Sequence, residues 1–328
     1  MNMWRLLKTF VGSMPKDYVV FANCKGKTAM VVSDGWTVME YKFSNPKPHG
    51  NICVHFTELF NVIHPHKKAD IQLDGNNVLV KLPNSKERIV LRGKRCNEFC
   101  SDEVVDKSKG ILVNISSIIK QFDKISRVAF MPPNDRYNVM FFSSSDEEQA
   151  DLVMISHPFF HAFTHLPQPF PFECVVNYNS FCHIAKMLKL LKVESAYALF
   201  EDDNNELYIW TDDVLFGTQA LPKVEFYFKP FEITTKIGEF VVENDIVAKA
   251  NAKALQINDV TYNIPHDFSG QLILSKRRLS HLKGKTCEVY CGSSELVLRI
   301  EDVSIRPKQL RGEWHGLYRP DPSNPFVI

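Results

Sequence analysis

The alternation of apolar and polar positions predicts one complete structural module between residues 171 and 222. An apolar strand over residues 172–178 leads into a helix over residues 179–192, and three short strands follow. These strands are expected at residues 195–201, 206–211 and 214–220. Turns rich in Asp and Asn separate them. The module is therefore a strand, a helix and a three-stranded antiparallel meander.

The predicted helix of this module has two chemically different faces. Phe181, Ile184, Leu188 and Leu191 recur at helical spacing, which predicts a side that faces the core. The opposite side is expected to carry His183, Lys186 and Lys189. One face of the helix should thus be buried while the other is cationic.

The leading strand of the module recurs along the chain. Similar apolar stretches begin at Ile52, Ile111, Phe172 and Gln271, so that the starts are 59, 61 and 99 residues apart. The last interval has room for two modules, which indicates a repeat of about 50 to 60 residues.

Helical patterns follow the other starts at residues 57–63, 116–125 and 276–283, and further strands are expected after the first and the last of them. In the second of these helices, Ile118, Phe122 and Ile125 form the apolar stripe. The chain start fits a fifth module, with Trp4, Leu7, Val11 and Met14 on one helix face and strands over residues 18–43. A sixth module is expected between residues 223 and 267. Its pattern is weaker, because residues 226–235 resemble a strand and residues 246–255 fit either a helix or a strand.

Composition sets the class of protein. The chain has 328 residues, of which 45% are hydrophobic, and is long enough for two or three folded domains. No run approaches the roughly 18 apolar residues that cross a bilayer, and the start does not fit a signal peptide, so we expect a soluble cytoplasmic protein. The eight cysteines are scattered, and we expect no disulfide. Cys287 and Cys291 are expected to share one face of a strand.

The net charge is +1, so the molecule as a whole does not attract nucleic acid strongly. The distribution of charge is more informative. Lysine and arginine gather on the predicted helices, whereas aspartate and glutamate gather in the turns. A nearly neutral protein can therefore present a basic face.

Paired modules of helix and antiparallel strands resemble the DNA sliding clamps of the bacterial polymerase beta-subunit type. The likeness is clearest over residues 56–92 and 173–217, and it rests on pattern because the family has no short diagnostic motif. In that family, helices line a central hole and strands form a continuous outer sheet. The resemblance implies an α+β protein of three similar domains. Their expected bounds are residues 1–107, 108–221 and 222–308, with a C-terminal tail over residues 309–328.

The resemblance implies a basic lining, and electrostatics supports it. A ring that moves along duplex DNA needs attraction to phosphates without base contacts that would pin it. Helical lysines are usually only solvated, but their recurrence in five modules favours a DNA-binding role. The candidates are Arg5, Lys8, Lys67, Lys68, Lys120, Lys124, Lys186, Lys189, Lys276, Arg277, Arg278 and Lys283.

The resemblance also implies an apolar pocket beside the second and third domains, where polymerase and clamp-loader peptides dock. The candidate residues are Leu221, Pro222, Val224, Phe326, Val327 and Ile328. The alternative for the last three is a frayed terminus.

Features typical of enzymes have simpler explanations. His157, His161 and His165 recur every fourth residue, but Pro158 and the lack of neighbouring ligands favour a linker over a zinc site. The Asp202–Asp203 and Asp212–Asp213 pairs fall at predicted hairpin turns, where aspartate is common for backbone reasons. No Gly-rich phosphate loop is present, so loading onto DNA would need a separate ATPase. We expect no cofactor, no metal and no catalytic activity.

The resemblance implies a processivity factor that encircles duplex DNA without sequence specificity and tethers the replicative DNA polymerase. Two chains would close a ring as a head-to-tail homodimer through unpaired edge strands. The short, divergent sequence suggests a phage or viral origin. Two alternatives stay open: a monomeric viral processivity factor that grips DNA by a basic face, and a β-rich structural or assembly protein with no nucleic-acid role.

Overall fold

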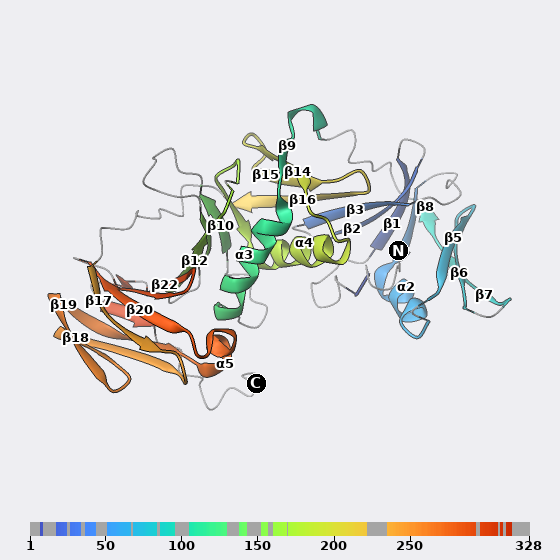
Figure 1. Ribbon diagram of the computed structural model, residues 1–328. Coiled ribbons are helices and arrows are strands. Elements are labelled where there is room, and N and C mark those ends of the chain that lie inside the picture. The colour runs from blue at the N-terminus through green and yellow to red at the C-terminus, as the bar shows by residue number, and fades with distance from the viewer. Residues whose placement is uncertain are drawn as a thin grey trace. The chain divides into compact units, whose positions relative to one another are not determined.

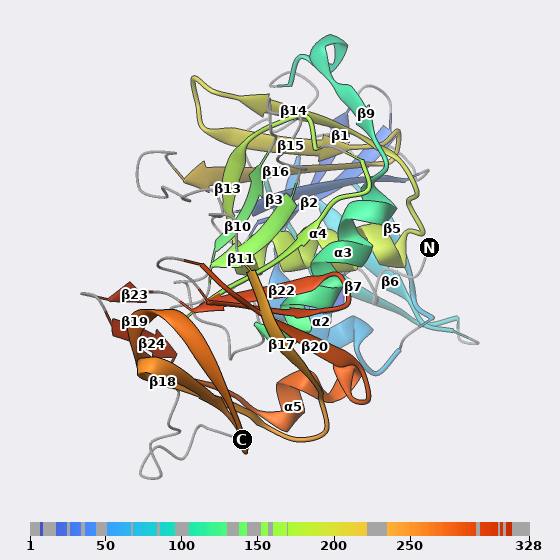
Figure 2. The same ribbon diagram turned by 60° about the vertical axis from the view of Figure 1, so that its left-hand side comes forward.

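The structure is a computed structural model and consists of helices packed on mainly antiparallel sheets (Figures 1 and 2). It describes residues 7–8, 18–24, 27–33, 37–43, 51–66, 68–83, 86–95, 105–129, 138–142, 152–156, 160–168, 170–221, 235–292, 296–307, 309–310 and 313–316. Backbone contacts divide the chain into two units. Unit 1 is Met1–Ser116 with Val176–Pro222, and unit 2 is Ser117–Val175 with Lys223–Ile328.

Unit 1 contains a long antiparallel sheet in the spatial order β9-β14-β15-β16-β3-β2-β1-β4-β8. Its strands are β1 (Tyr18–Cys24), β2 (Lys27–Ser33), β3 (Thr37–Phe43), β4 (Ile52–His55), β8 (Lys94–Arg95), β9 (Ile111–Val113), β14 (Ala196–Glu201), β15 (Glu206–Trp210) and β16 (Val214–Leu221). A second sheet holds β5 (Asp70–Asp74), β6 (Asn77–Lys81) and β7 (Arg88–Arg92). The helical elements are α2 (Phe56–Ile63), η2 (Lys107–Lys109) and α4 (Tyr178–Leu190).

Unit 2 contains an antiparallel sheet in the order β10-β11-β12-β22-β21-β20-β17. Its strands are β10 (Asn138–Phe142), β11 (Leu152–Ser156), β12 (Phe160–His165), β17 (Thr235–Val241), β20 (Thr286–Cys291), β21 (Leu296–Ile300) and β22 (Val303–Pro307). A second sheet holds β18 (Ile246–Ile257), β19 (Val260–Leu274), β23 (Gln309–Leu310) and β24 (Glu313–Gly316). The helical elements are α3 (Ile115–Val128), α5 (Lys276–Leu279) and η4 (Ser280–Leu282). Strand β13 (Cys174–Asn177) and helix α3 each have residues in both units.

The sheets continue across two predicted domain borders. Strand β3, from the predicted first domain, pairs with β16 of the second, and the buried hydroxyl oxygens of Thr37 and Thr218 lie 3.3 Å apart at this junction. Strand β12 of the predicted second domain pairs with β22 of the third. These pairings agree with the expected continuous outer sheet. They also explain why contacts group the chain into two units, while the exact bounds of the three predicted domains stay a prediction.

The module predicted from residues 171–222 is confirmed. The side chain of Asn177 accepts hydrogen bonds from the amides of Asn179 and Ser180 at 2.9 and 3.3 Å, which satisfies donors at the start of α4. Phe181, Ile184 and Leu188 are fully buried, as the helical spacing predicted. Figure 1 shows α4 lying along one face of the unit 1 sheet.

The described residues of the sixth module, 235–267, contain no helix. Residues 246–255, which fit either a helix or a strand, form part of β18, and Ile246, Ala248 and Ala250 are buried at the alternating positions of a strand. Only residues 242–245 connect β17 to β18, which is too short for a helix of ordinary length. The predicted strand over residues 226–235 lies outside the described residues except for its last residue, Thr235.

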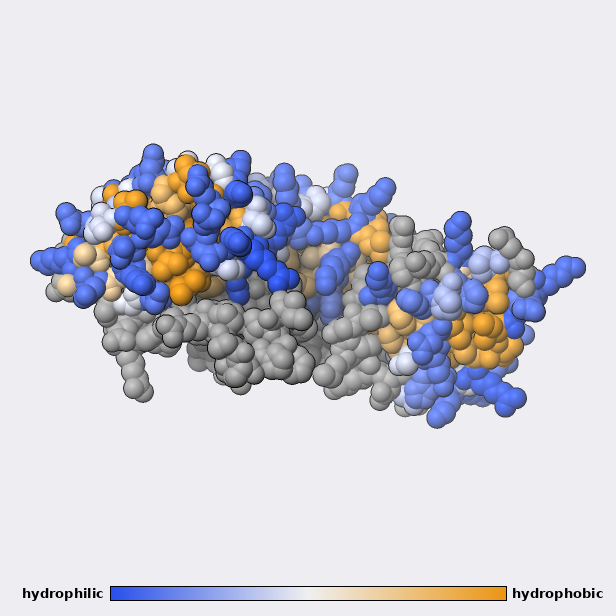
Figure 3. All heavy atoms as spheres, turned by 90° about the horizontal axis from the view of Figure 1, so that it is seen from below, coloured by the Kyte–Doolittle hydropathy of each residue, from blue (hydrophilic) through white to orange (hydrophobic). Residues whose placement is uncertain are grey.

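The surface of the described residues is mixed in polarity. Figure 3 shows one face of the molecule, on which hydrophilic side chains predominate and apolar patches are scattered. Among the described residues, no helix combines the length and hydrophobicity that a membrane span requires.

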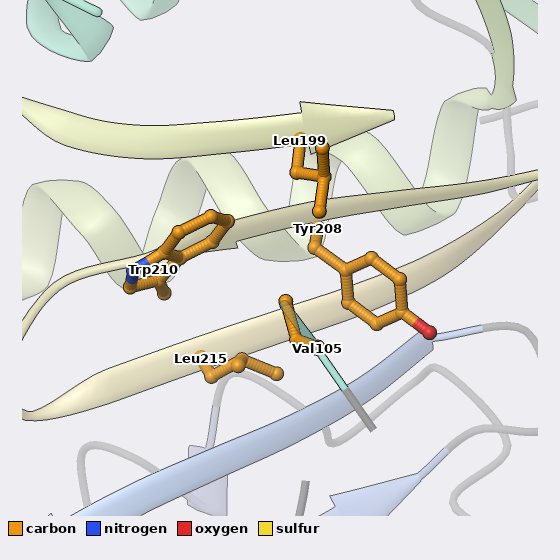
Figure 4. Close-up of a cluster of buried hydrophobic side chains, with 5 residues drawn as sticks. All are labelled: Val105, Leu199, Tyr208, Trp210 and Leu215. Carbon is orange, nitrogen blue, oxygen red and sulfur yellow. The ribbon is translucent and has the colours of Figure 1, made fainter. Parts of the chain in front are cut away.

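The segment that precedes β9 covers a small apolar cluster on the unit 1 sheet (Figure 4). The cluster consists of Val105, Leu199, Tyr208, Trp210 and Leu215. Gly110 lies so close to the indole of Trp210 that a Cβ atom at this position would be 2.3 Å from the ring. A residue with a side chain would therefore displace the indole, which explains the glycine.

Candidate nucleic-acid interface

The basic residues of α4 occupy its exposed face. Lys186 and Lys189 are exposed and lie three residues apart, so they are neighbours on the helix surface. The prediction that His183 shares this face is wrong, because His183 is only 7% exposed. The buried part of α4 is wider than the single apolar stripe that was predicted, because Tyr178, Ala185 and Met187 are also buried.

Helix α3 carries a basic stripe of three residues. Lys120 is exposed, Lys124 is half-buried and Arg127 is exposed, with the spacing i, i+4 and i+7 that places them on one face. Sequence reasoning missed Arg127, although the same periodicity would have identified it. Lys124 forms an ion pair with Asp302, in the turn between β21 and β22. The charge of one predicted DNA-binding lysine is thus partly offset.

Helix α5 packs against the end of α3. The Nη1 atom of Arg278 donates a hydrogen bond of 3.1 Å to the carbonyl oxygen of Val128, where the backbone acceptors of α3 lack helical partners. Lys276 and Arg277 are exposed, as is Lys283 beyond the helix. The prediction of a helix over residues 276–283 is wrong in its length, because α5 ends at Leu279 and a 3₁₀ turn follows.

His281 lies beside this junction but adds little positive charge at neutral pH. Burial lowers the pKa of His281 below its ordinary value, and the nearby charge of Arg127 lowers it further. The nearby backbone of Lys124 and of Arg278 raises the pKa, but these effects are smaller. The cationic character of this region therefore comes from lysine and arginine.

The remaining DNA-binding candidates are distributed unevenly. Helix α2 has no basic residue and carries Glu58 in its first turn, while Lys68 is exposed after the helix. Lys8 is exposed beside the buried Leu7. Arg5 and Lys67 lie outside the described residues. In the described part of the chain, the helical basic residues therefore belong mainly to α3, α4 and α5.

The proposed partner-peptide pocket is largely outside the described residues. Leu221 is the last residue of β16, and its side chain is not described. Pro222, Val224, Phe326, Val327 and Ile328 lie outside the described residues as well. The pocket stays a prediction.

His161 and His165 do not lie in a linker, contrary to the sequence prediction. His161 and His165 belong to β12, which pairs with β11 and β22. His157 lies outside the described residues. Within the described ranges, no group of three or more His, Cys, Asp or Glu residues could hold a metal ion. The two aspartate pairs lie in the turns between β14, β15 and β16, as predicted.

The cysteines differ from the sequence prediction at one position. Cys53 in β4 is disulfide-bonded, so the expectation that no disulfide forms is wrong. The sulfur atom bonded to it lies outside the described side chains. Cys174, Cys182, Cys287 and Cys291 do not belong to a disulfide. Spacing alone could not reveal the disulfide, because it depends on which segments the fold brings together.

Cys287 is expected to be chemically inert in the folded protein. Cys287 and Cys291 lie on the buried face of β20. Burial raises the pKa of Cys287 to about 12, and the nearby charge of Glu288 makes a smaller contribution in the same direction. Because the thiolate is the reactive form, iodoacetamide at pH 8 should label Cys287 and Cys291 only after denaturation. The half-buried Cys182 should react sooner and serves as the internal reference, with labelling followed by peptide mass spectrometry. Equal labelling rates for Cys287 and Cys182 in the native protein would contradict the expectation.

The repeated modules of helix on antiparallel sheet, continued from one predicted domain into the next, define a sliding-clamp fold. Several solved structures of other proteins have the same fold. The DNA polymerase III beta chain of Streptococcus pneumoniae matches with a TM-score of 0.61 and 12% identity over 94% of this chain and 97% of that chain. The DNA polymerase sliding clamp of Caulobacter crescentus matches with a TM-score of 0.64 and 12% identity, over 94% of this chain and 99% of that chain. The DNA polymerase sliding clamp of Pseudomonas aeruginosa matches with a TM-score of 0.62 and 12% identity, over 94% of this chain and 97% of that chain.

No protein-family model and no curated protein sequence matches the chain. The likeness is therefore one of fold and not of sequence. The α+β class and the three-domain layout agree with these clamp structures, which confirms the fold predicted from the repeat pattern.

Proposed function

We propose that this protein is a DNA sliding clamp, a non-enzymatic processivity factor that encircles duplex DNA without sequence specificity and tethers a DNA polymerase. The observation that carries the proposal is the combination of the clamp fold with exposed basic residues on three of its helices. Lys120, Lys186 and Arg277 are representative of these residues. Mobile ammonium and guanidinium groups attract phosphates without selecting bases, as sliding requires.

The proposed partners follow from this role. They are duplex DNA, a replicative DNA polymerase, a separate clamp-loader ATPase and a second copy of the chain, acting in the cytoplasm. Strand β7 supports the head-to-tail homodimer, because in the described part of the chain it pairs only with β6, and Val90 is 53% exposed. An exposed edge strand of this kind is suited to pairing with another chain.

A monomeric processivity factor is the second candidate. The absence of a helix from residues 235–267 favours it, since the short connection over residues 242–245 adds no helical basic residue to the lining. Such a protein would hold DNA by one basic face without enclosing it.

Retention on circular and linear DNA distinguishes the two candidates. After assembly on a nicked plasmid, with the cognate loader if one is needed, a closed ring should remain on the circle at moderate salt. It should leave within minutes when a restriction enzyme linearises the DNA. A monomeric binder should respond to salt but not to linearisation. Measurement of the mass in solution gives the matching control, since a ring of this type requires a dimer. Failure to bind either form of DNA would refute both candidates.

A further inference from the structure

Asp302 is an acidic residue placed within a basic surface of unit 2. Its carboxylate pairs with Lys124, the middle member of the stripe formed by Lys120, Lys124 and Arg127. The two paired side chains are 33% and 43% exposed, so the ion pair is accessible to solvent. A DNA backbone that approached α3 would therefore meet Lys124 with a carboxylate already bound.

The hairpin that carries Asp302 fixes the position of the carboxylate. Ile300 and Val303 are directly paired and fully buried, so Glu301 and Asp302 form a tight two-residue turn. Glu301 has a φ of 55°, and its carbonyl oxygen accepts a hydrogen bond of 3.3 Å from Nε of Arg299. Glu301 also pairs with Lys285 at 2.7 Å. The turn is thus held by both strands and by a second ion pair.

The other side of the contact is also fixed. Arg278 binds the carbonyl oxygen of Val128, which attaches α5 to the end of α3. Lys120 and Arg127 stay exposed, and the nearest acidic residue on α3 itself is the half-buried Asp123. The Lys124–Asp302 ion pair joins α3 to a rigid hairpin at a point where cations outnumber carboxylates.

We propose that Asp302 acts as an internal competitor for phosphate at Lys124 and thereby limits how strongly α3 holds DNA; this inference rests on the proposed function. An exposed ion pair is only weakly favourable, so exchange of the carboxylate for a phosphate is easy in both directions. Lys120 and Arg127 attract DNA at all times, whereas Lys124 contributes only while Asp302 is displaced. A conditional contact of this kind weakens the grip without removing the basic surface, which favours movement along the duplex.

Salt-dependent affinity tests the proposal through Asp302→Asn, a change of similar shape that aspartate turns accept. Equilibrium binding to nicked circular duplex DNA, with the cognate loader if one is needed, is measured over a series of NaCl concentrations, with circular dichroism to confirm folding. One additional phosphate contact should make the slope of log K against log salt more negative by about 0.9 and raise affinity roughly 5- to 10-fold near 0.1 M salt. In a Lys124→Met background, the same change should have little effect.

Glu301→Gln is the matched control, because it removes the same charge from the same turn but releases Lys285 instead of Lys124. Its effect on the slope should be clearly smaller. The proposal is overturned if Asp302→Asn equals Glu301→Gln, or if its gain persists without Lys124. If Asp302→Asn does not fold, Asp302→Ser replaces it with the same criteria. Absence of any binding by the unmodified protein to nicked circular DNA, with the cognate loader if one is needed, would instead refute the proposed function, and the role of Asp302 with it.

Discussion

Reversing the charge of Lys120, Lys186 and Lys189 together to glutamate is expected to abolish retention on duplex DNA. All three side chains are exposed on helices, on α3 and α4, so the substitutions should leave the core intact. Loss of three phosphate contacts should lower affinity roughly 100-fold or more near 0.1 M salt, and the introduced carboxylates add repulsion. Retention on a nicked circular plasmid, measured by gel filtration at several salt concentrations, reports the effect.

Two double variants with the same change in net charge show whether loss of DNA retention comes from local contacts of α4 or from the net charge of the protein. Lys186→Glu with Lys189→Glu changes two exposed residues of α4, whereas Lys249→Glu with Lys253→Glu changes two exposed residues of strand β18. Both pairs alter the net charge equally. Only the α4 pair should reduce retention. Undiminished retention in the triple variant would remove the electrostatic basis of the proposed function.

Lys42→Met is expected to destabilise the protein by about 3 kcal/mol, because it removes the ion pair that Lys42 forms with the buried carboxylate of Glu40. Glu40 is fully buried in β3, directly between Val31 of β2 and Leu215 of β16. The Nζ atom of Lys42 lies 3.6 Å from Oε1 of Glu40, and the Lys42 side chain is only 11% exposed. Urea denaturation, followed by fluorescence, measures the free energy of unfolding.

The double variant Glu40→Gln with Lys42→Met is the control for this prediction. Replacing both residues removes the buried carboxylate together with the lysine that pairs with it, so most of the lost stability should return. A loss below about 1 kcal/mol in Lys42→Met alone would show that another interaction compensates the Glu40 charge.

Local periodicity was sufficient for the elements whose partners lie nearby in the chain. The spacing of Phe181, Ile184 and Leu188 predicted both α4 and its buried side. The aspartate-rich turns predicted the hairpins of β14, β15 and β16. These features succeed because helical and strand periods, and the backbone preferences of turn residues, act over a few residues. The repetition of such patterns then indicated the clamp fold.

Where two local structures fit one pattern, the sequence was ambiguous. Leu279 and Leu282 lie three residues apart, a spacing that suits a 3₁₀ turn as well as an α-helix, and the structure divides the segment between the two. Residues 246–255 likewise fitted a helix or a strand. Their pairing with β19, from Ile246 opposite Leu274 onward, gave the strand.

The amino-acid sequence by itself determined the repeated module, the α+β class and the presence of basic residues on the helices, because each depends on patterns within one segment. Only the tertiary structure decided that His183 is buried, that Cys53 is disulfide-bonded and that Lys124 meets Asp302. Lys124 and Asp302 are 178 residues apart, and no local period connects them. Burial and pairing of this kind depend on which surfaces the fold brings into contact, and that information is distributed over the whole chain.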